Sequence, residues 1–191
     1  MDTLKEKLHF PRTERELYDS KVLYLNDKDI REIPKEIQLL DNLEILYLNK
    51  NHITKLPSEL FRLKNLKELY VGQNQIEKIP KEIENLKKLE KLSLYGNNIK
   101  EFPAEITNLK NLNVLHLGKN HIKQIPKEIG KLTNLTHLFL NKNEIEQIPI
   151  EIGNLRNLKY FSVMDNHIDS VPKSIAPFLK NLKGFYVKGN M

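Results

Sequence analysis

Few side chains in this sequence could take part in catalysis, and they do not form a recognisable set. Glu68 is the one acidic residue at the outward-facing positions defined below, whereas glycoside hydrolysis needs a pair of carboxyl groups. The sequence contains no G-x-S-x-G, no H-E-x-x-H and no Gly-rich phosphate-binding loop. It also has no cysteine, which excludes disulfide bonds, thiolate metal sites and cysteine nucleophiles. We therefore expect that the protein is not an enzyme.

Histidine is the remaining residue type that could bind a metal ion. His116 and His137 are expected to lie diagonally on adjacent strands. Two imidazoles without a third protein ligand fall short of the usual zinc site. His52, His121 and His167 each follow an asparagine in an expected turn and are predicted to be solvated. The sequence thus predicts neither a metal site nor a cofactor.

A repeat of 23 residues supplies the elements that position these side chains. The segment LEILYLNKN at 43–51 follows the pattern L-x-x-L-x-L-x-x-N. The pattern starts again, each time 23 residues later, at Leu66, Leu89, Leu112, Leu135 and Leu158. A degenerate first copy starts at Ser20, and an eighth starts one residue late at Leu182. A period of this length indicates a solenoid, in which each repeat packs against its neighbours.

Numbered from the first leucine of each copy, positions 3 to 7 are expected to form a short strand. Side chains alternate along a strand, so positions 4 and 6 should point inward and positions 3, 5 and 7 outward, on a concave face. Six of the seven tyrosines occupy these outward positions. Gly72 and Gly118 flank Tyr95 at position 7 and should leave room beside its ring. The candidate partner-binding residues on this face are Tyr24, Tyr47, Tyr70, Tyr95, His116, His137, Phe139, Tyr160, Met164 and Tyr186.

Two explanations of these outward aromatic residues are open. Aromatic side chains favour strands and stack on cross-strand neighbours, so Tyr24, Tyr47 and Tyr70 could form a ladder that only stabilises the sheet. Tyrosine is also prominent among interface hot spots, and a solvent-facing apolar band carries a risk of association. We favour an interaction surface for a protein partner. Glycan binding by the same aromatic residues is the alternative.

The other recurrent positions have structural explanations. Position 9 is asparagine in seven of the eight copies, and its amide can satisfy backbone groups of neighbouring turns. Position 15 is proline in seven copies, and position 17 is glutamate in six. Proline ends an extended segment, and a carboxylate suits the start of a helical turn. These columns therefore predict short 3₁₀ or irregular turns on the convex side.

Residues 1–19 are predicted to form a short helical cap. Thr13 and Glu16 fit a capping box that starts a helix after an interruption at Pro11. Leu17 would then lie over the open end of the first repeat. A cap of this kind protects the exposed core of a solenoid.

Residues 20–191 are predicted to form the solenoid itself, with seven repeats and a partial eighth. Leu182, Phe185 and Val187 of the last copy are expected to lie beside an open edge. Exposed apolar ends of solenoids tend to associate. The expected state is a monomer, with a dimer through this C-terminal edge as the alternative.

The segment IPKEIGKLTNL at 125–135 fits the pattern I/L-P-x-E-I/L-x-x-L. From residue 20 to 190 the sequence resembles the leucine-rich-repeat family, and its unit is similar to the 23-residue class of bacterial, notably spirochaete, and eukaryotic Ras-associated repeat proteins. The resemblance implies an α/β solenoid of horseshoe shape, with a parallel concave β-sheet and short convex turns. It also implies a non-catalytic scaffold for protein–protein interaction. For a virulence-associated bacterial protein, the partner would be a host protein.

The formal net charge of +6 makes nucleic acid a candidate partner that the positions of the charges can test. Among the outward positions only Glu68, Lys91 and Lys188 carry a full charge. Phosphate binding needs basic side chains on the contacting face. We therefore expect a protein partner and no nucleic acid.

No segment approaches the ~18 apolar residues of a membrane span, so no membrane insertion is expected. The first residues, MDTLKEK, contain no apolar stretch typical of a signal peptide. The localisation is undetermined, since a cytoplasmic protein and one secreted without a recognisable signal both fit.

Overall fold

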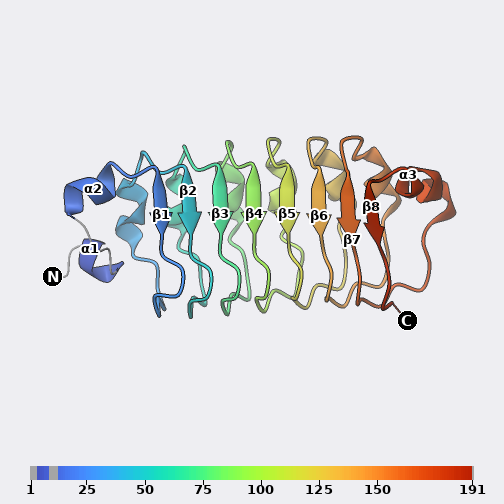
Figure 1. Ribbon diagram of the computed structural model, residues 1–191, viewed down its shortest axis with the longest axis horizontal. Coiled ribbons are helices and arrows are strands. Elements are labelled where there is room, and N and C mark those ends of the chain that lie inside the picture. The colour runs from blue at the N-terminus through green and yellow to red at the C-terminus, as the bar shows by residue number, and fades with distance from the viewer. Residues whose placement is uncertain (1–3, 9–12, 191) are drawn as a thin grey trace.

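The computed structural model describes residues 4–8 and 13–190. Its eight strands are parallel and pair in chain order from β1 to β8. They lie side by side across one face of the molecule, with the turns behind them (Figure 1). The strands are β1 (Val22–Tyr24), β2 (Ile45–Tyr47), β3 (Glu68–Tyr70), β4 (Lys91–Ser93), β5 (Val114–His116), β6 (His137–Phe139), β7 (Tyr160–Ser162) and β8 (Gly184–Tyr186).

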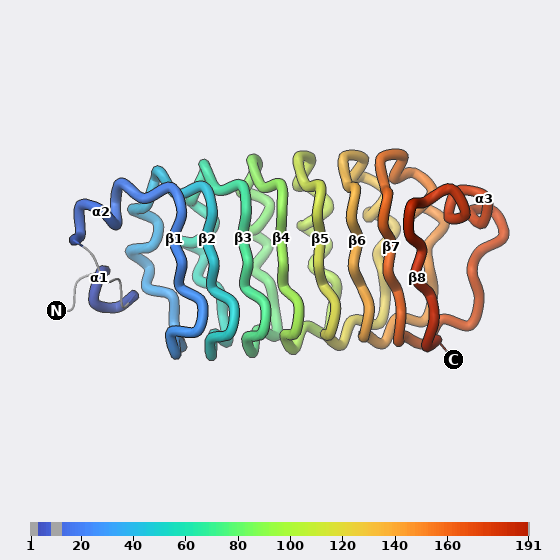
Figure 2. Tube along the Cα trace, in the orientation of Figure 1, coloured from blue at the N-terminus to red at the C-terminus, as the bar shows by residue number. Residues whose placement is uncertain are grey.

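Each repeat makes one coil of a solenoid, and the coils stack along the long axis of the molecule (Figure 2). The sheet is open, with β1 and β8 as its two edge strands. Every strand pairs with the next at a shift of one repeat, so equal positions of neighbouring repeats lie beside each other. The predicted α/β solenoid with a parallel sheet is confirmed.

The strands are shorter than predicted, because they cover positions 3 to 5 rather than 3 to 7. Repeat-to-repeat hydrogen bonds continue past the strand, since Leu48 N donates to Tyr70 O (2.7 Å) and Lys50 N donates to Gly72 O (2.9 Å). At position 8 the chain adopts a positive φ, 57° for Lys50, which ends the extended geometry. All eight copies share this left-handed position.

The core is one continuous stack of inward-facing aliphatic side chains. Leu46, Leu69 and Leu92, at position 4 of successive repeats, are all fully buried. Asparagines at position 9 are also buried and satisfy backbone groups inside the stack. Asn97 Nδ2 donates to the carbonyl oxygens of two residues at 3.0 Å, while its Oδ1 accepts from a third backbone N–H at 3.0 Å. The predicted structural role of this asparagine column is confirmed.

The convex turns are 3₁₀ helices that start immediately after the position-15 prolines, as predicted. Pro80, for example, has φ −61° and ψ 144°, which is extended backbone, and the helix begins at the next residue. These helices are η1 (Lys35–Leu39), η2 (Ser58–Arg62), η3 (Lys81–Asn85), η4 (Ala104–Asn108), η5 (Lys127–Lys131), η6 (Ile150–Asn154) and η7 (Lys173–Ile175).

Two short helices, α1 (Leu4–Lys7) and α2 (Glu14–Tyr18), lie beyond β1 (Figure 1). Thr13 and Glu16 form the predicted capping box, in which each side chain bonds the other residue's backbone N–H. Leu17 is completely buried, as expected for a residue that covers the end of the core. The first repeat therefore has no exposed core at its outer side.

Part of the predicted cap lies outside the described residues, including the break at Pro11. The division of the chain into a cap (1–19) and a solenoid (20–191) stays a prediction.

At the other end, the 3₁₀ helix of the seventh repeat is shortened to three residues, and α3 (Ala176–Lys180) follows it directly. Leu182, Phe185 and Val187 pack against the core but are only half-buried. Leu23 of β1, in contrast, is almost completely buried. The predicted open edge at β8 is thus present, and the two ends of the solenoid differ.

Candidate functional site

The candidate site is the outward side of the sheet, which we call the sheet face and which consists of the side chains at positions 3, 5 and 7. All ten predicted residues lie on it. Tyr24 and Tyr186 are exposed, and the other eight are half-buried. The leucines and other apolar residues between them at positions 4 and 6 point into the core, as predicted from the alternation of side chains.

Tyr24, Tyr47 and Tyr70 form a stacked ladder across β1, β2 and β3, which we call the tyrosine ladder. The ring centroids are 5.0 Å apart for the first pair and 4.8 Å apart for the second. The ring planes are nearly parallel, at 4° and 6°. Both faces of the Tyr47 ring are therefore covered by its neighbours. The ladder offers ring edges and hydroxyl groups, and one free ring face at Tyr24, whose exposed fraction is 68%.

A charged pair ends the tyrosine ladder at β3 and β4. Tyr70 Oη donates to Glu68 Oε2 (2.6 Å), and Lys91 Nζ lies 3.0 Å from Glu68 Oε1. Burial acts to raise the pKa of Glu68, but the hydrogen bonds from Tyr70 and Lys91 outweigh it, so the pKa lies below its ordinary value. Burial and the Glu68 carboxylate together raise the pKa of Tyr70. The two opposite charges compensate each other, and the centre of the sheet face is locally neutral.

A second group of rings covers the C-terminal half of the sheet face, and we call it the mixed cluster. Its members are Tyr95, His116, His137, Phe139 and Tyr160. The Tyr95 and His116 centroids are 4.8 Å apart at 37°, and the His116 and Phe139 rings meet edge to face at 5.3 Å. His137 stacks on Tyr160 at 4.9 Å. Most of these rings are tilted relative to one another, so the mixed cluster lacks the parallel stacking of the tyrosine ladder.

The two histidines of the mixed cluster favour the neutral state. Burial lowers the pKa of His116, and burial with the positive charge of Lys159 lowers the pKa of His137. Nδ1 of His137 lies 2.8 Å from Thr136 Oγ1, which orients its ring. At neutral pH the mixed cluster is therefore an uncharged aromatic surface.

Gly184 has a role that the sequence analysis did not assign. A Cβ atom at this position would lie 2.7 Å from Tyr186 Oη and 2.9 Å from Tyr160 Cδ1. The Tyr186 ring thus folds over Gly184 and fills the space beside Tyr160. The signal in the sequence was the glycine itself, because every other copy has a side chain at position 3.

The space beside Tyr95 is narrower than predicted. A Cβ atom at Gly118 would lie 2.8 Å from Asn141 Oδ1 and 3.1 Å from His116 Nε2. At Gly72 a Cβ atom would lie 3.1 Å from Asn49 Oδ1, which accepts a hydrogen bond from Gly72 N at 2.7 Å. Side chains of neighbouring repeats fill this space, and the sequence of one repeat taken alone does not indicate these contacts.

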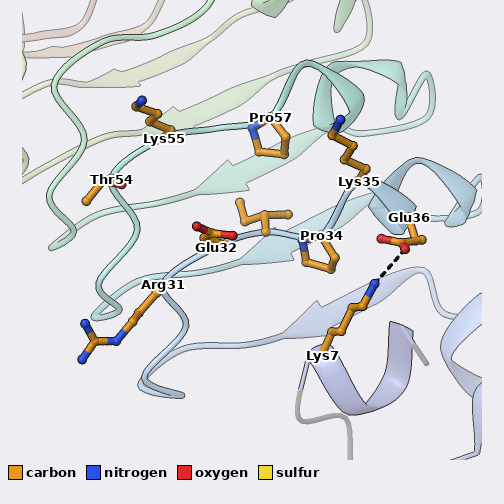
Figure 3. Close-up of a pocket in the computed structure, with 10 residues that line it drawn as sticks. Lys7, Arg31, Glu32, Pro34, Lys35, Glu36, Thr54, Lys55 and Pro57 are labelled. Atoms are coloured by element: carbon orange, nitrogen blue, oxygen red, sulfur yellow. Dashed lines mark hydrogen bonds and ion pairs between the residues drawn. The ribbon is translucent and has the colours of Figure 1, made fainter. Parts of the chain in front are cut away.

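A cavity of about 710 Å³ lies away from the sheet face, between α1 and the turns of the first two repeats (Figure 3). Inside it, Lys7 Nζ and Glu36 Oε1 form an ion pair at 2.8 Å. Figure 3 shows the Arg31 and Lys55 side chains directed away from this pair. The cationic groups do not converge on a common point, and we assign this cavity no ligand.

Other features that would mark a site are not found in the part of the chain that the structure describes. It contains no group of three or more His, Cys, Asp or Glu side chains that could hold a metal ion. No helix within 4–8 and 13–190 combines the length and the apolar character needed to cross a membrane.

Sequence profiles of leucine-rich repeats match most of the chain. The profile "Leucine-rich repeat region" matches residues 12–98, and "Leucine Rich repeats (2 copies)" matches 87–131 and 110–155. The chain belongs to the leucine-rich-repeat family. Domains of this family are generally protein-interaction scaffolds and typically not enzymes, in line with the coarse prediction from the sequence.

Solved leucine-rich-repeat structures from bacteria are similar to the chain over nearly its whole length. A Leptospira interrogans leucine-rich-repeat protein is 41% identical over 92% of the chain, with a TM-score of 0.88. Internalin C2 of Listeria monocytogenes is 26% identical over 98% of the chain, with a TM-score of 0.83, and 81% of it is covered. The predicted likeness to bacterial, notably spirochaete, repeat proteins is confirmed.

A plant receptor is also similar. The leucine-rich-repeat ectodomain of the Arabidopsis thaliana receptor kinase GASSHO1/SCHENGEN3, solved in complex with CASPARIAN STRIP INTEGRITY FACTOR 2, is 28% identical over 84% of the chain. Its TM-score is 0.64, and the chain covers 22% of it. The chain likewise spans 45% of the Leptospira protein, which is less than half its length. No curated protein matches the sequence.

Proposed function

We propose that this leucine-rich-repeat protein is a non-catalytic scaffold that binds a protein partner across the sheet face. One observation carries the proposal: ten large side chains gather on a face whose core is already closed beneath them. Leu92 is 1% exposed although its strand carries Lys91 and Ser93 outward instead of rings, so outward rings are not needed to seal the interior. Large amphipathic side chains in such a position are typical of interface hot spots.

The dimensions and charge of the sheet face suit a polypeptide partner. Eight strands spaced ~4.8 Å apart give a face roughly 34 Å long, which is enough for an interface of standard size. The tyrosine ladder forms one half of the sheet face, and stacking holds its rings in fixed positions. The mixed cluster forms the other half with rings that are mostly tilted, and the Glu68–Lys91 pair between the two halves adds no net charge.

Two structural neighbours support a polypeptide ligand. One is the plant ectodomain in complex with CASPARIAN STRIP INTEGRITY FACTOR 2, and another is the plant peptide hormone receptor RGFR1 in complex with RGF2. The bacterial neighbours come from Leptospira interrogans and Listeria monocytogenes. A search for the partner should therefore use host-cell extracts as well as bacterial extracts.

Stacking within the tyrosine ladder disfavours the glycan alternative. A sugar ring packs on the face of an aromatic ring, but both faces of Tyr47 are covered by the stacked rings of its neighbours. Tyr70 also commits its hydroxyl group to Glu68. Tyr24 and Tyr70, at the two ends of the ladder, each have one face that no other ladder ring covers. The ladder thus has little to offer a sugar and much to offer the side chains of a polypeptide.

The test replaces two rings of the mixed cluster by residues that the fold already accepts at the same positions. Tyr95→Asn introduces the residue found at position 7 in Asn141, and Phe139→Ser introduces the residue found at position 5 in Ser93. The double variant should keep its circular dichroism spectrum. It should lose the captured partner, with a Kd weaker by roughly 30-fold or more if two hot-spot residues are removed.

The matched control removes an exposed apolar side chain from the turn side. Ile150 is 58% exposed at position 16, where Lys127 stands in the preceding repeat, so Ile150→Lys should fold and bind normally. Partner capture from extracts is compared by quantitative mass spectrometry for all three proteins, with a glycan array in parallel. Equal capture by all three, or binding confined to the glycan array, would contradict the proposal.

A further inference from the structure

A row of basic side chains follows the edge where each turn enters the next strand, at the upper ends of the strands in Figure 1. It occupies the position two residues before the first leucine of a repeat. Asp41 and Thr133 stand at this position in two repeats. The basic members, which we call the basic row, are Lys64, Lys87, Lys110, Arg156 and Lys180, and all five are exposed.

Hydrogen bonds between repeats hold the backbone of this row in register. Asn111 Nδ2 donates to Lys87 O (2.7 Å), and Asn134 Nδ2 donates to Lys110 O (2.8 Å). In the same way, Asn65 Nδ2 donates to Asp41 O in the first repeat, and Asn157 Nδ2 donates to Thr133 O. Since neighbouring strands lie ~4.8 Å apart, the row runs about 19 Å over the four steps from Lys64 to Arg156. The asparagine amides are used for this purpose and are not free to bind a ligand.

The charges of the basic row are not compensated within the described residues. None of its five members forms an ion pair there, whereas Lys21 and Lys67 on the adjoining strand-start positions both pair with Glu44. Lys88 adds a further cation beside the row, and its Nζ donates to the neutral Asn65 side chain (2.8 Å). The row is thus a line of cations without ion-paired anions.

A second lysine column shows that this arrangement is not a general result of the repeat. Lys81, Lys127 and Lys173 stand at position 16 of alternate repeats. Lys81 and Lys127 form no ion pair within the described residues either, but a glutamate follows each of them at position 17. The basic row, in contrast, has lysines in three consecutive repeats, and none of them is followed by an acidic residue.

We propose that the basic row binds a linear sulfated polysaccharide of the heparin type. Lysine ammonium groups are point charges that attract anions without requiring a fixed orientation. Basic clusters of this kind are typical of heparin and nucleic-acid contacts. A flexible chain with closely spaced anions can follow a straight row and contact each cation in turn. The row lies at the edge of the sheet, so this activity is separate from binding on the sheet face.

The geometry disfavours the other polyanions. Phosphates wind around a DNA duplex once every ~34 Å, so they leave a straight 19 Å line after a few contacts. Binding of single-stranded nucleic acid relies on aromatic stacking, and the row contains no aromatic residue. A peripheral membrane contact is strengthened by apolar side chains that enter the lipid, and the row contains none.

Titration with a size-defined heparin octasaccharide tests the proposal on the whole protein. The row variant carries Lys64→Gln, Lys87→Gln and Lys110→Gln. The matched control carries Lys81→Gln, Lys127→Gln and Lys173→Gln, which changes the net charge by the same amount. At about 0.15 M salt we expect the row variant to bind roughly tenfold or more weakly, and the control to stay within about twofold of the unaltered protein.

Three further results decide the outcome. The Tyr95→Asn/Phe139→Ser protein should keep its heparin affinity, which separates this proposal from binding on the sheet face. Vesicles with phosphatidylserine and a 20-base-pair DNA duplex should bind more weakly than heparin. Equal losses in the two lysine variants, no heparin binding, or tighter binding of the duplex or the vesicles would overturn the proposal.

Discussion

At the scale of single residues, the buried asparagines at position 9 are polar groups that the fold cannot leave unpaired. Asn97 is 5% exposed, and its amide serves Val71 O, Leu94 O and Ile76 N. Replacing Asn97 by Ala leaves Ile76 N without a partner in the core, while Val71 O and Leu94 O each lose one of two donors, because Asn74 Nδ2 and Asn120 Nδ2 still donate to them. We expect a loss of about 1–3 kcal/mol in the free energy of unfolding, measured by urea denaturation.

The neighbouring asparagine is the control for this prediction. Asn98 is exposed, and only its backbone N–H takes part, donating to Ile76 O. Asn98→Ala should change the free energy of unfolding by less than about 0.5 kcal/mol. Similar effects of the two substitutions would show that the amide bonds of Asn97 are not what holds neighbouring coils together.

His116 gives the sheet face a pH dependence whose direction can be derived. Its pKa in the folded protein lies below the unfolded value of about 6.5, so the unfolded chain binds the proton more readily. Stability should therefore fall as the pH drops below about 6.5. His116→Gln should reduce the fall in the urea midpoint between pH 7.5 and 5.5. An unchanged pH dependence in this variant would contradict the burial of the ring.

Residue types predicted which side chains face outward and offered the stacked tyrosine ladder as one explanation, but they did not predict the other side-chain contacts. The alternation along each strand was enough to place Tyr47 and Phe139 on the sheet face. The bond from Tyr70 to Glu68 and the fold of Tyr186 over Gly184 depend on side-chain rotamers, which the repeat pattern does not encode. The ladder and the interface explanations also turn out to be compatible, because stacked rings still present their edges.

At the scale of elements, position 8 ends the extended segment that continues beyond every strand. The backbone there is left-handed in each copy, and φ is 67° at Gly96. A Cβ atom at Gly96 would have its nearest neighbour at 3.5 Å, so space is sufficient and only the backbone conformation opposes a side chain. Gly96→Ala should therefore destabilise the protein by about 1 kcal/mol in urea unfolding.

Asparagine tolerates the left-handed conformation better than alanine does. Gly96→Asn should accordingly cost less than Gly96→Ala. A larger cost for Asn would show that steric contact with Gln73, rather than backbone conformation, controls this position.

The sequence predicted the turns more closely than the strands. Proline at position 15 fixes the extended residue after which each 3₁₀ helix begins, so these starts followed from local chemistry. The end of each extended segment depends on the positive φ at position 8, where Lys50, Gln73 and Lys142 are not residues that indicate a left-handed conformation. Tertiary stacking imposes that conformation on them, and a single copy gives no signal for it.

At the scale of the whole molecule, the two ends of the solenoid should differ in stability. Leu8 and Leu17 close the core beyond β1, whereas Phe185 and Val187 of the last repeat remain half-buried. In a solenoid each repeat is stabilised by its neighbours, and β8 has a neighbour on one side only. Hydrogen exchange should be faster in β8 than in β4.

Strand β1 is the reference in the same experiment, because it is also an edge strand but α2 lies beyond it. Amides of β1 should exchange more slowly than those of β8. Equal protection at both ends would indicate that β8 is covered in solution, for example by the C-terminal dimer that the sequence left as an alternative.

Two surfaces of different chemistry thus lie on one stack of repeats. The sheet face is aromatic and nearly neutral, and the basic row along its edge is charged and free of aromatic residues. The fold and its outward positions followed from the 23-residue period. The basic row did not, because its significance depends on the distances between repeats and on which lysines form ion pairs.

Site-specific photo-cross-linking tests the central claim most directly, because it captures whichever protein occupies the surface. A benzophenone amino acid replaces Tyr95 or Phe139 on the sheet face, or Ile150 on the turn side, and each protein is irradiated in the same host and bacterial extracts. The account predicts the same covalent adduct from both sheet-face positions and none from position 150. Adducts from position 150 alone, or no adduct from positions 95 and 139, would contradict it.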